Sequence, residues 1–202
     1  MKKTIYVLLP FVIFFVISCS KTNPDQPDIN TSQTFKDPRD GQVYNTVKIG
    51  NQIWMKENLN YATSSGSWCA DCDTYGRLYD WQTAQTVAPP GWHLPSETEW
   101  GFLIDHLGGY QVAGGKMKTT TGWLTPNLGA DNSSGFSGLA AGMQEFDGTY
   151  HGLGYFGVFW TTNESVNPTS NGQFCMINYS TSMAQRLTIP KITSLSVRCI
   201  KD

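Results

Sequence analysis

Five cysteines and three histidines are the residues of this 202-residue chain with the greatest chemical potential. Cys69 and Cys72 form a Cys-x-x-Cys pair, a spacing found in redox-active dithiols, in half-sites for zinc and in disulfides that close small loops. A redox pair normally opens the helix of a βαβ unit, and zinc needs a second pair of ligands at matching spacing. The surrounding sequence offers neither, so we predict a structural disulfide between Cys69 and Cys72.

Two further cysteines, Cys175 and Cys199, lie on segments with the composition of β-strands. If Cys19 carries a lipid anchor, as argued below, an even number of cysteines remains, which is typical of disulfide-bonded proteins in oxidising compartments. A second disulfide across these strands is one possibility, and two free thiols are the other.

The histidines and carboxylates form no pattern typical of an enzyme. His93, His106 and His151 are dispersed, and none lies at metal-ligand spacing from another. Glu97 and Glu99 are close together, but the start of a helix explains both. The chain has no nucleophile elbow, phosphate-binding loop or dinucleotide fingerprint. We therefore expect a protein that is not an enzyme and has no cofactor and no metal site.

Two long glycine-rich loops are better candidates for function, because recognition residues are commonly placed on loops. They cover residues 125–135 (TPNLGADNSSG) and 147–157 (DGTYHGLGYFG). Aromatic side chains there would stack on a sugar ring, and polar side chains would supply hydrogen bonds. The equally weighted alternative is a pair of ordinary surface loops. The candidate ligand-binding residues are Asp131, Asn132, Asp147, Tyr150, His151 and Tyr155.

The N-terminal residues predict export. Lys2 and Lys3 precede an apolar stretch, residues 5–17, which is typical of a secretory signal and shorter than the ~20 residues that span a bilayer. The stretch ends at Val16-Ile17-Ser18-Cys19, which resembles the bacterial lipobox. That resemblance implies a signal peptide over residues 1–18 and a lipid on Cys19. The alternative is an ordinary cleaved signal in which Cys19 is incidental.

The polar residues 19–34, with two prolines, predict a flexible tether, and residues 35–202 are long enough for a single domain. The formal net charge of −2, without a dense Lys/Arg cluster, argues against nucleic acid as a partner. We expect the chain to be lipid-anchored at the outer membrane or cell surface, with the membrane and an extracellular ligand as its partners.

One helix is well defined by the sequence. Ser96 and Glu99 fit a capping box, and apolar residues at positions 100, 103, 104 and 107 then share one helical face. Gly108-Gly109 ends the pattern, so we predict a helix over residues 97–107.

The other segments predict a second short helix and a set of strands. Residues 77–86 have helical character and stop before Pro89-Pro90. A hairpin is expected from two strands joined at Gly50-Asn51. The combination predicts an α+β domain with two short helices and a mostly antiparallel, twisted sheet. The predicted strands are residues 42–49, 52–55, 136–146, 155–162, 174–179, 183–189 and 195–200.

Several strings in this chain resemble the Fibrobacter succinogenes major paralogous domain, a family of exported bacterial proteins. More distantly, the pattern is similar to the C-type lectin fold and to its formylglycine-generating relatives. The family resemblance implies a single domain that runs almost to the C-terminus. The matching strings are Asp40–Tyr44, Val47–Tyr61, Tyr75–Trp81, Gly91–Trp100, Phe159–Thr162 and Ser196–Cys199.

The resemblance also bears on the cysteines and on activity. A cysteine usually stands where this chain has Ala88 and pairs with the cysteine of the closing strand, so the resemblance implies that Cys199 pairs with Cys175 instead. The closely spaced catalytic cysteines of the formylglycine-generating enzymes are not matched. The calcium-binding motifs of the lectins are also missing, since Asn167-Pro168 and Trp160-Thr161-Thr162 stand in their place.

These observations favour a surface lipoprotein whose non-catalytic, C-type-lectin-like domain binds an extracellular glycan or protein. The alternative is a structural or assembly component of the cell envelope that has no soluble ligand.

Overall fold

The computed structural model describes Met1 and residues 33–202. The predicted lipid attachment at Cys19, nearly all of the signal peptide and most of the tether therefore lie outside the described residues. Strand β1 (Thr34–Lys36) takes up the last residue of the expected tether. Within the described part of the chain, no helix is long and apolar enough to cross a membrane.

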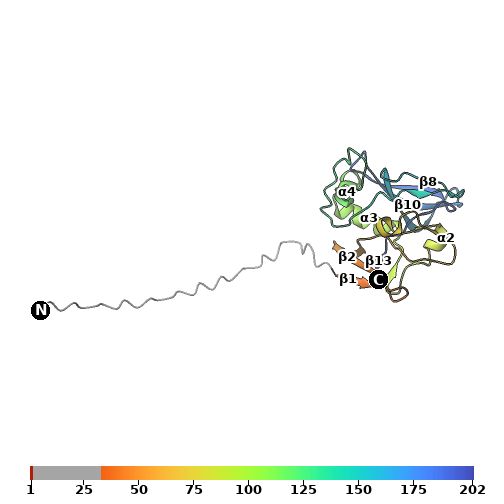
Figure 1. Ribbon diagram of the computed structural model, residues 1–202. Coiled ribbons are helices and arrows are strands. Elements are labelled where there is room, and N and C mark those ends of the chain that lie inside the picture. The colour runs from red at the N-terminus through yellow and green to blue at the C-terminus, as the bar shows by residue number, and fades with distance from the viewer. Residues whose placement is uncertain (2–32) are drawn as a thin grey trace.

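Strands from both ends of the domain share a five-stranded sheet, in the order β1-β2-β3-β13-β6 (Figure 1). All of its pairings are antiparallel. Besides β1, the sheet contains β2 (Val43–Ile49), β3 (Gln52–Met55), β13 (Ile200–Lys201) and β6 (Trp92–His93). The predicted hairpin is confirmed as β2 and β3, and Gly50 at its turn has φ 59°, where a glycine is favoured.

A second sheet has six strands in the order β11-β10-β9-β12-β5-β4. Its pairings are antiparallel except for β12 with β9. A separate two-stranded hairpin, β7 with β8, stands beside it. The strands are β4 (Ser67–Trp68), β5 (Leu78–Tyr79), β7 (Met143–Gln144), β8 (Tyr150–His151), β9 (Phe156–Glu164), β10 (Asn171–Asn178), β11 (Ala184–Pro190) and β12 (Leu195–Ser196).

Four helices occur among the described residues, two more than predicted. They are α1 (Cys72–Tyr75), α2 (Trp81–Ala84), α3 (Glu97–His106) and α4 (Tyr110–Met117). The prediction for α3 is confirmed together with its capping box, because Ser96 Oγ accepts the Glu99 N–H and the Glu99 carboxylate accepts the Ser96 N–H. The α+β class is confirmed, with mostly antiparallel sheets.

Three predicted elements were wrong in extent. Only residues 143–144 of the expected strand 136–146 are strand, because Ser137 and Gly142 have positive φ angles that break an extended chain. The expected helix 77–86 begins only at Trp81, since Leu78–Tyr79 pair as β5. The expected strand 195–200 is divided into β12 and β13, which belong to different sheets.

Two groups of buried side chains make up the core. One contains Tyr79, Trp160 and Cys199, and the other contains Trp100 and Cys175. Arg198 lies fully buried beside both groups and donates to Asn58 Oδ1 at 2.7 Å and to the carbonyl oxygen of Phe136 at 2.6 Å. This residue therefore ties the end of the chain to distant segments by polar contacts inside the core.

Candidate functional site

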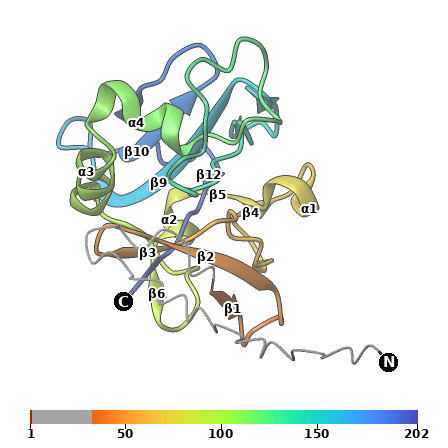
Figure 2. The ribbon, with the colours of Figure 1, turned by 90° about the vertical axis from the view of Figure 1, so that its left-hand side faces the viewer.

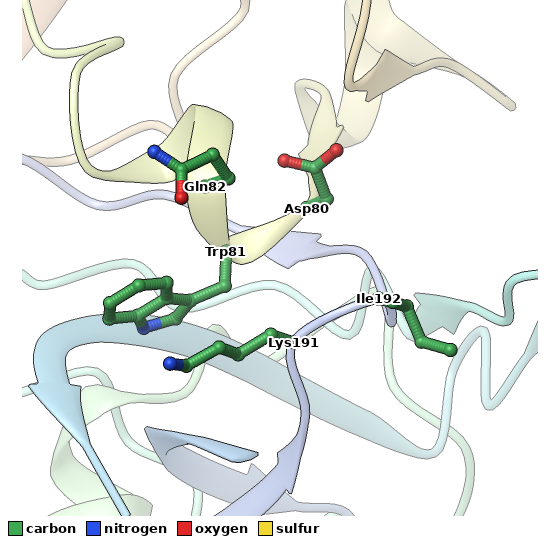
Figure 3. Close-up of a pocket in the computed structure, with 5 residues that line it drawn as sticks. All are labelled: Asp80, Trp81, Gln82, Lys191 and Ile192. Carbon is green, nitrogen blue, oxygen red and sulfur yellow. The ribbon is translucent and has the colours of Figure 1, made fainter. Parts of the chain in front are cut away.

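A pocket of about 260 Å³ opens where the start of α2 meets the turn after β11. Asp80 and Gln82 lie on the helix side, Lys191 and Ile192 lie on the opposite side, and Trp81 stands between them (Figure 3). The two sides are joined by a backbone hydrogen bond of 3.1 Å from the Trp81 N–H to the Lys191 carbonyl oxygen. The residues that line this small cavity thus include a carboxylate, an amide, an ammonium and an indole.

Asp80 is the N-cap of α2, and this role fixes its carboxylate at the pocket. Its Oδ1 accepts the Thr83 N–H at 2.7 Å, which satisfies one of the free N–H groups of the first helical turn. Its Oδ2 has no hydrogen-bond partner among the described residues. One oxygen therefore positions the side chain, and the other lies beside Gly66, where an added Cβ would come within 2.8 Å of it.

Trp81 and Lys191 form the floor and one wall of the pocket. The Lys191 Nζ lies 4.3 Å from the centre of the indole ring and 2.9 Å from Glu164 Oε1, a cation–π contact combined with an ion pair. Trp81 is only 8% exposed, and its Nε1 is buried without a hydrogen-bond partner in the described structure. A buried polar atom without a partner is uncommon in folded proteins, and this indole nitrogen lies buried beside Gly172 of β10 as an unsatisfied donor.

The hairpin of β7 and β8 pairs with the segment that follows this pocket. Gln144 of β7 exchanges two backbone hydrogen bonds with Ser194, at 3.0 and 2.8 Å, and Ser194 follows Ile192 by two residues. Because neighbouring strands lie about 4.8 Å apart, β8 is about 10 Å from the Ser194 segment. The hairpin is thus tied to the segment that follows the pocket, although none of its residues lines the pocket.

Three predicted binding residues belong to this hairpin. Tyr150 and His151 form β8, and both are exposed. Asp147 Oδ1 accepts the Thr149 N–H at 2.9 Å in the turn, and this hydrogen bond lowers the pKa of the carboxyl. Asp147, Tyr150 and His151 therefore lie together on this hairpin, and none of them lines the pocket.

The structure places the other three predicted residues elsewhere. Asp131 donates its N–H to the carbonyl oxygen of Gly115 in α4, and its side chain caps the turn at Ser133. Asn132 has φ 51° and bonds Ser137 through both ends of its amide, so its side chain is used within the loop. Tyr155 packs against Tyr179 with ring centres 5.3 Å apart. The six predicted residues therefore do not form one site.

The cysteine predictions had mixed outcomes. Cys69 and Cys72 form a disulfide, as predicted. The Cys175–Cys199 disulfide that the resemblance implied is not formed, because both cysteines are free and buried. Cys175 packs in the group around Trp100, whereas Cys199 packs in the group around Tyr79 and Trp160, so the two thiols face different parts of the core. Burial raises the pKa of each thiol to about 12.

His93 is the centre of a charged cluster at the start of α3. Its Nδ1 lies 2.7 Å from Asp202 Oδ1, and its Nε2 lies 2.8 Å from Glu99 Oε1. Burial lowers the pKa of His93, but the hydrogen bonds and charges of the two carboxylates outweigh it and raise the pKa overall. Glu99 also belongs to the capping box, so the cluster fastens the end of the chain to α3, and His93 has a structural role there.

The described residues contain no group of three or more His, Cys, Asp or Glu side chains that could hold a metal ion. The important residues that the sequence did not reveal are Trp81 and Lys191. Trp81 closes the family string Tyr75–Trp81, which offered a signal, whereas nothing in the sequence around Lys191 distinguishes it.

The geometry defines a two-sheet α+β domain with a small polar pocket, and comparison with known proteins gives its family. Residues 47–201 match the family model described as the Fibrobacter succinogenes major domain. The chain belongs to this family. No curated protein and no solved structure matches the chain.

Proposed function

We propose that this chain is an exported, lipid-anchored surface protein whose domain binds an extracellular glycan in the Trp81–Lys191 pocket. The carrying observation is a pocket of about 260 Å³ whose lining residues Asp80, Gln82 and Lys191 bring a carboxylate, an amide and an ammonium to the surroundings of Trp81. Sugar hydroxyls both donate and accept hydrogen bonds, so they suit a site that offers acceptors and donors together.

Two further features support a glycan rather than a small compact ligand. The segment that follows the pocket pairs with β7 at Ser194, so Tyr150 and His151 of the hairpin would meet distant sugar units of a longer chain. Ile192 is 62% exposed at the pocket wall and offers an apolar surface for the carbon face of a sugar ring. An extended ligand would therefore make contacts on both elements.

The anchoring and the lectin-like comparison are part of the same proposal. The lipobox-like sequence around Cys19 supports the lipid anchor. A C-type-lectin-like arrangement is supported by a sheet that contains both the first and the last strand of the domain. The irregular segment between α4 and β7, where the loop 125–135 lies, supports it as well.

The proposal is tested by a glycan array probed with the detergent-solubilised full chain, with and without calcium. Asp80→Asn keeps the N-cap acceptor but removes the charge, and Lys191→Met removes the ammonium. Each change is expected to weaken binding to the array hit by about tenfold or more, because each removes a charged hydrogen-bond partner of the ligand. Calcium is expected to make no difference.

The matched controls are Asp105→Asn on α3 and Lys48→Met on β2, which change the same charges on exposed residues away from the pocket. Both should bind like the unmodified protein. Binding that survives Asp80→Asn and Lys191→Met would place the site elsewhere. An array without any hit would contradict the glycan proposal and favour a structural role in the cell envelope.

A further inference from the structure

A strip of exposed apolar side chains runs over one face of the domain, away from the Trp81–Lys191 pocket. Leu124, Leu128, Leu153 and Tyr155 are 42%, 52%, 56% and 48% exposed, respectively. These four residues and Tyr179 form the apolar strip. Isolated exposed leucines are ordinary, but a contiguous group on a folded domain commonly marks an interaction surface.

Backbone contacts make the strip continuous and fix its shape. The Leu124 N–H donates to the carbonyl oxygen of Gly154 at 2.9 Å, which sets Leu124 beside the turn that carries Leu153 and Tyr155. The Leu128 N–H donates to the carbonyl oxygen of Tyr179 at 2.8 Å, and the Tyr179 ring packs against that of Tyr155. The strip therefore needs no rearrangement to present its side chains together.

At one end the strip enters a second pocket, of about 280 Å³. Leu153 lines this pocket as well as the strip, and Ala141 lies beside it. The facing wall includes Ala70 and Asp71, the two residues between the disulfide-bonded cysteines, together with Tyr75 of α1. In Figure 2, α1 and the β7–β8 hairpin lie on the same side of the molecule. A disulfide-closed loop thus forms one wall of a pocket large enough for an apolar side chain.

The exposed charge around the strip is mainly negative. The segments 61–76, 119–130, 139–157 and 178–183 contain no Lys or Arg, although Arg77 directly follows the first of them and the fully buried Lys118 directly precedes the second. They contain four carboxylates, at Asp71, Asp73, Glu145 and Asp147. Asp71 lies at the pocket itself. The surface is therefore apolar along its length and acidic at its margins, which suits a partner that is apolar and basic.

We propose that the apolar strip and its pocket dock an extended, basic segment of a partner protein, with one apolar side chain of that segment in the pocket. Lysine or arginine residues beside that side chain would face Asp71 and Asp73. Exposed leucines contribute little to binding a hydroxyl-rich glycan, so this site is separate from the Trp81–Lys191 pocket. The chain would then join an envelope protein at one face and a glycan at another.

The test uses three fluorescent ten-residue peptides and the detergent-solubilised full chain, with binding followed by fluorescence anisotropy. One peptide alternates lysine with leucine, one alternates glutamate with leucine, and one alternates lysine with serine. The lysine–leucine peptide is expected to bind, and the other two at least about tenfold more weakly. Equal binding of the lysine–serine peptide would overturn the proposal, because the interaction would then depend on charge alone.

Substitutions locate the site. Leu153→Ser should weaken binding of the lysine–leucine peptide by about tenfold, because Leu153 joins the strip and the pocket. Leu187→Ser is the matched control, since Leu187 is 40% exposed on β11, outside the strip. Asp71→Asn keeps the hydrogen-bond acceptor that caps α1 but removes the charge, so it should weaken binding of the lysine–leucine peptide. The difference from the unmodified protein should become smaller as the salt concentration is raised.

Two results would contradict the docking surface: no binding of the lysine–leucine peptide, or equal loss with Leu153→Ser and Leu187→Ser. Asp80→Asn, which tests the glycan pocket, should leave peptide binding unchanged. The two proposals can therefore fail independently.

Discussion

At the scale of single residues, the most unusual group is the ammonium of Lys118. The side chain is fully buried, and its Nζ donates to the carbonyl oxygens of Leu128, Asn178 and Thr181 at 2.9, 2.8 and 2.9 Å. Burial lowers the pKa of Lys118 to about 8, which leaves it charged at neutral pH. The three carbonyls belong to two segments that are distant in sequence, so one positive charge holds together the loops that carry part of the apolar strip.

The first prediction concerns this ammonium. Lys118→Met fills a similar volume but leaves three buried carbonyl oxygens without a donor, so the free energy of unfolding should fall by about 3 kcal/mol. Lys116→Met, which changes a half-buried lysine of α4, should change it by less than about 0.5 kcal/mol. Urea unfolding followed by tryptophan fluorescence measures both. Equal stability of the Lys118→Met protein would mean that the carbonyls find other partners.

The second prediction concerns His93 and pH. Its folded-state pKa is raised by Glu99 and Asp202, so the folded state holds a proton that the unfolded state has released. The stabilisation is complete below the unfolded pKa of about 6.5 and is lost as pH rises through the higher folded pKa. Urea unfolding at intervals from pH 6 upward should show this loss in the unmodified protein. The slope should be absent in His93→Gln and present in His151→Gln, which changes the exposed histidine of β8.

At the scale of elements, two glycines in neighbouring helices have opposite roles. A Cβ at Gly114 in α4 would collide with the backbone carbonyl oxygen of Met183 before β11. A Cβ at Gly101 in α3 would meet nothing closer than Arg186 Nη1 at 3.7 Å. The glycine in α4 therefore permits close packing against the sheet, whereas the one in α3 carries only the conformational cost of glycine in a helix.

The third prediction follows from this difference. Gly101→Ala should raise the free energy of unfolding by about 0.5–1 kcal/mol, because alanine favours the helix. Gly114→Ala should lower it by about 1–3 kcal/mol, because the added methyl group forces the helix away from the backbone near Met183. Thermal unfolding of the two proteins in parallel provides the measurement. The same sign of change in both would show that packing against Met183 does not limit α4.

The same glycines explain where sequence analysis succeeded and failed at this scale. Helix α3 was predictable because Ser96 and Glu99 mark its start by local chemistry and its apolar residues repeat on one face. Helix α4 was missed because Gly114 and Gly115 have a low helix propensity, and the reason for Gly114 is a contact with residues far away in sequence. The segment 136–146 was mistaken for a strand because Phe136 is buried from an irregular loop, a role that hydrophobicity alone does not distinguish from a strand.

At the scale of the whole molecule, long-range contacts decided what the sequence could reveal of the site. The hairpin residues Asp147, Tyr150 and His151 were found because a single loop carries them. Trp81 and Lys191 meet only because the chain brings α2 against the turn after β11. For the same reason Cys175 and Cys199 looked like disulfide partners in the sequence, although the fold places them in separate parts of the core.

The fourth prediction tests this arrangement of the core. In the folded protein neither Cys175 nor Cys199 should react with a thiol reagent at neutral pH, because both are fully buried and their raised pKa values disfavour the reactive thiolate. In denaturant both should be labelled without prior reduction. Peptide mapping by mass spectrometry identifies the labelled residues. A Cys175–Cys199 cross-linked peptide would contradict the structure, and Cys69–Cys72 should remain cross-linked as an internal control.

The sheet that joins β1 to β13 places the first and the last described strands at one end of the domain, while the β7–β8 hairpin and the loop that carries Leu124 and Leu128 lie toward the other end (Figure 2). A lipid on Cys19, as proposed above, would therefore attach the molecule through its sheet end and leave the hairpin and that loop at the unattached end. A reporter fused after Asp202 would then sit at the attached end of the domain and leave that hairpin and loop unobstructed. The end of the domain opposite the attachment would then be the end that is free to contact a ligand or a partner.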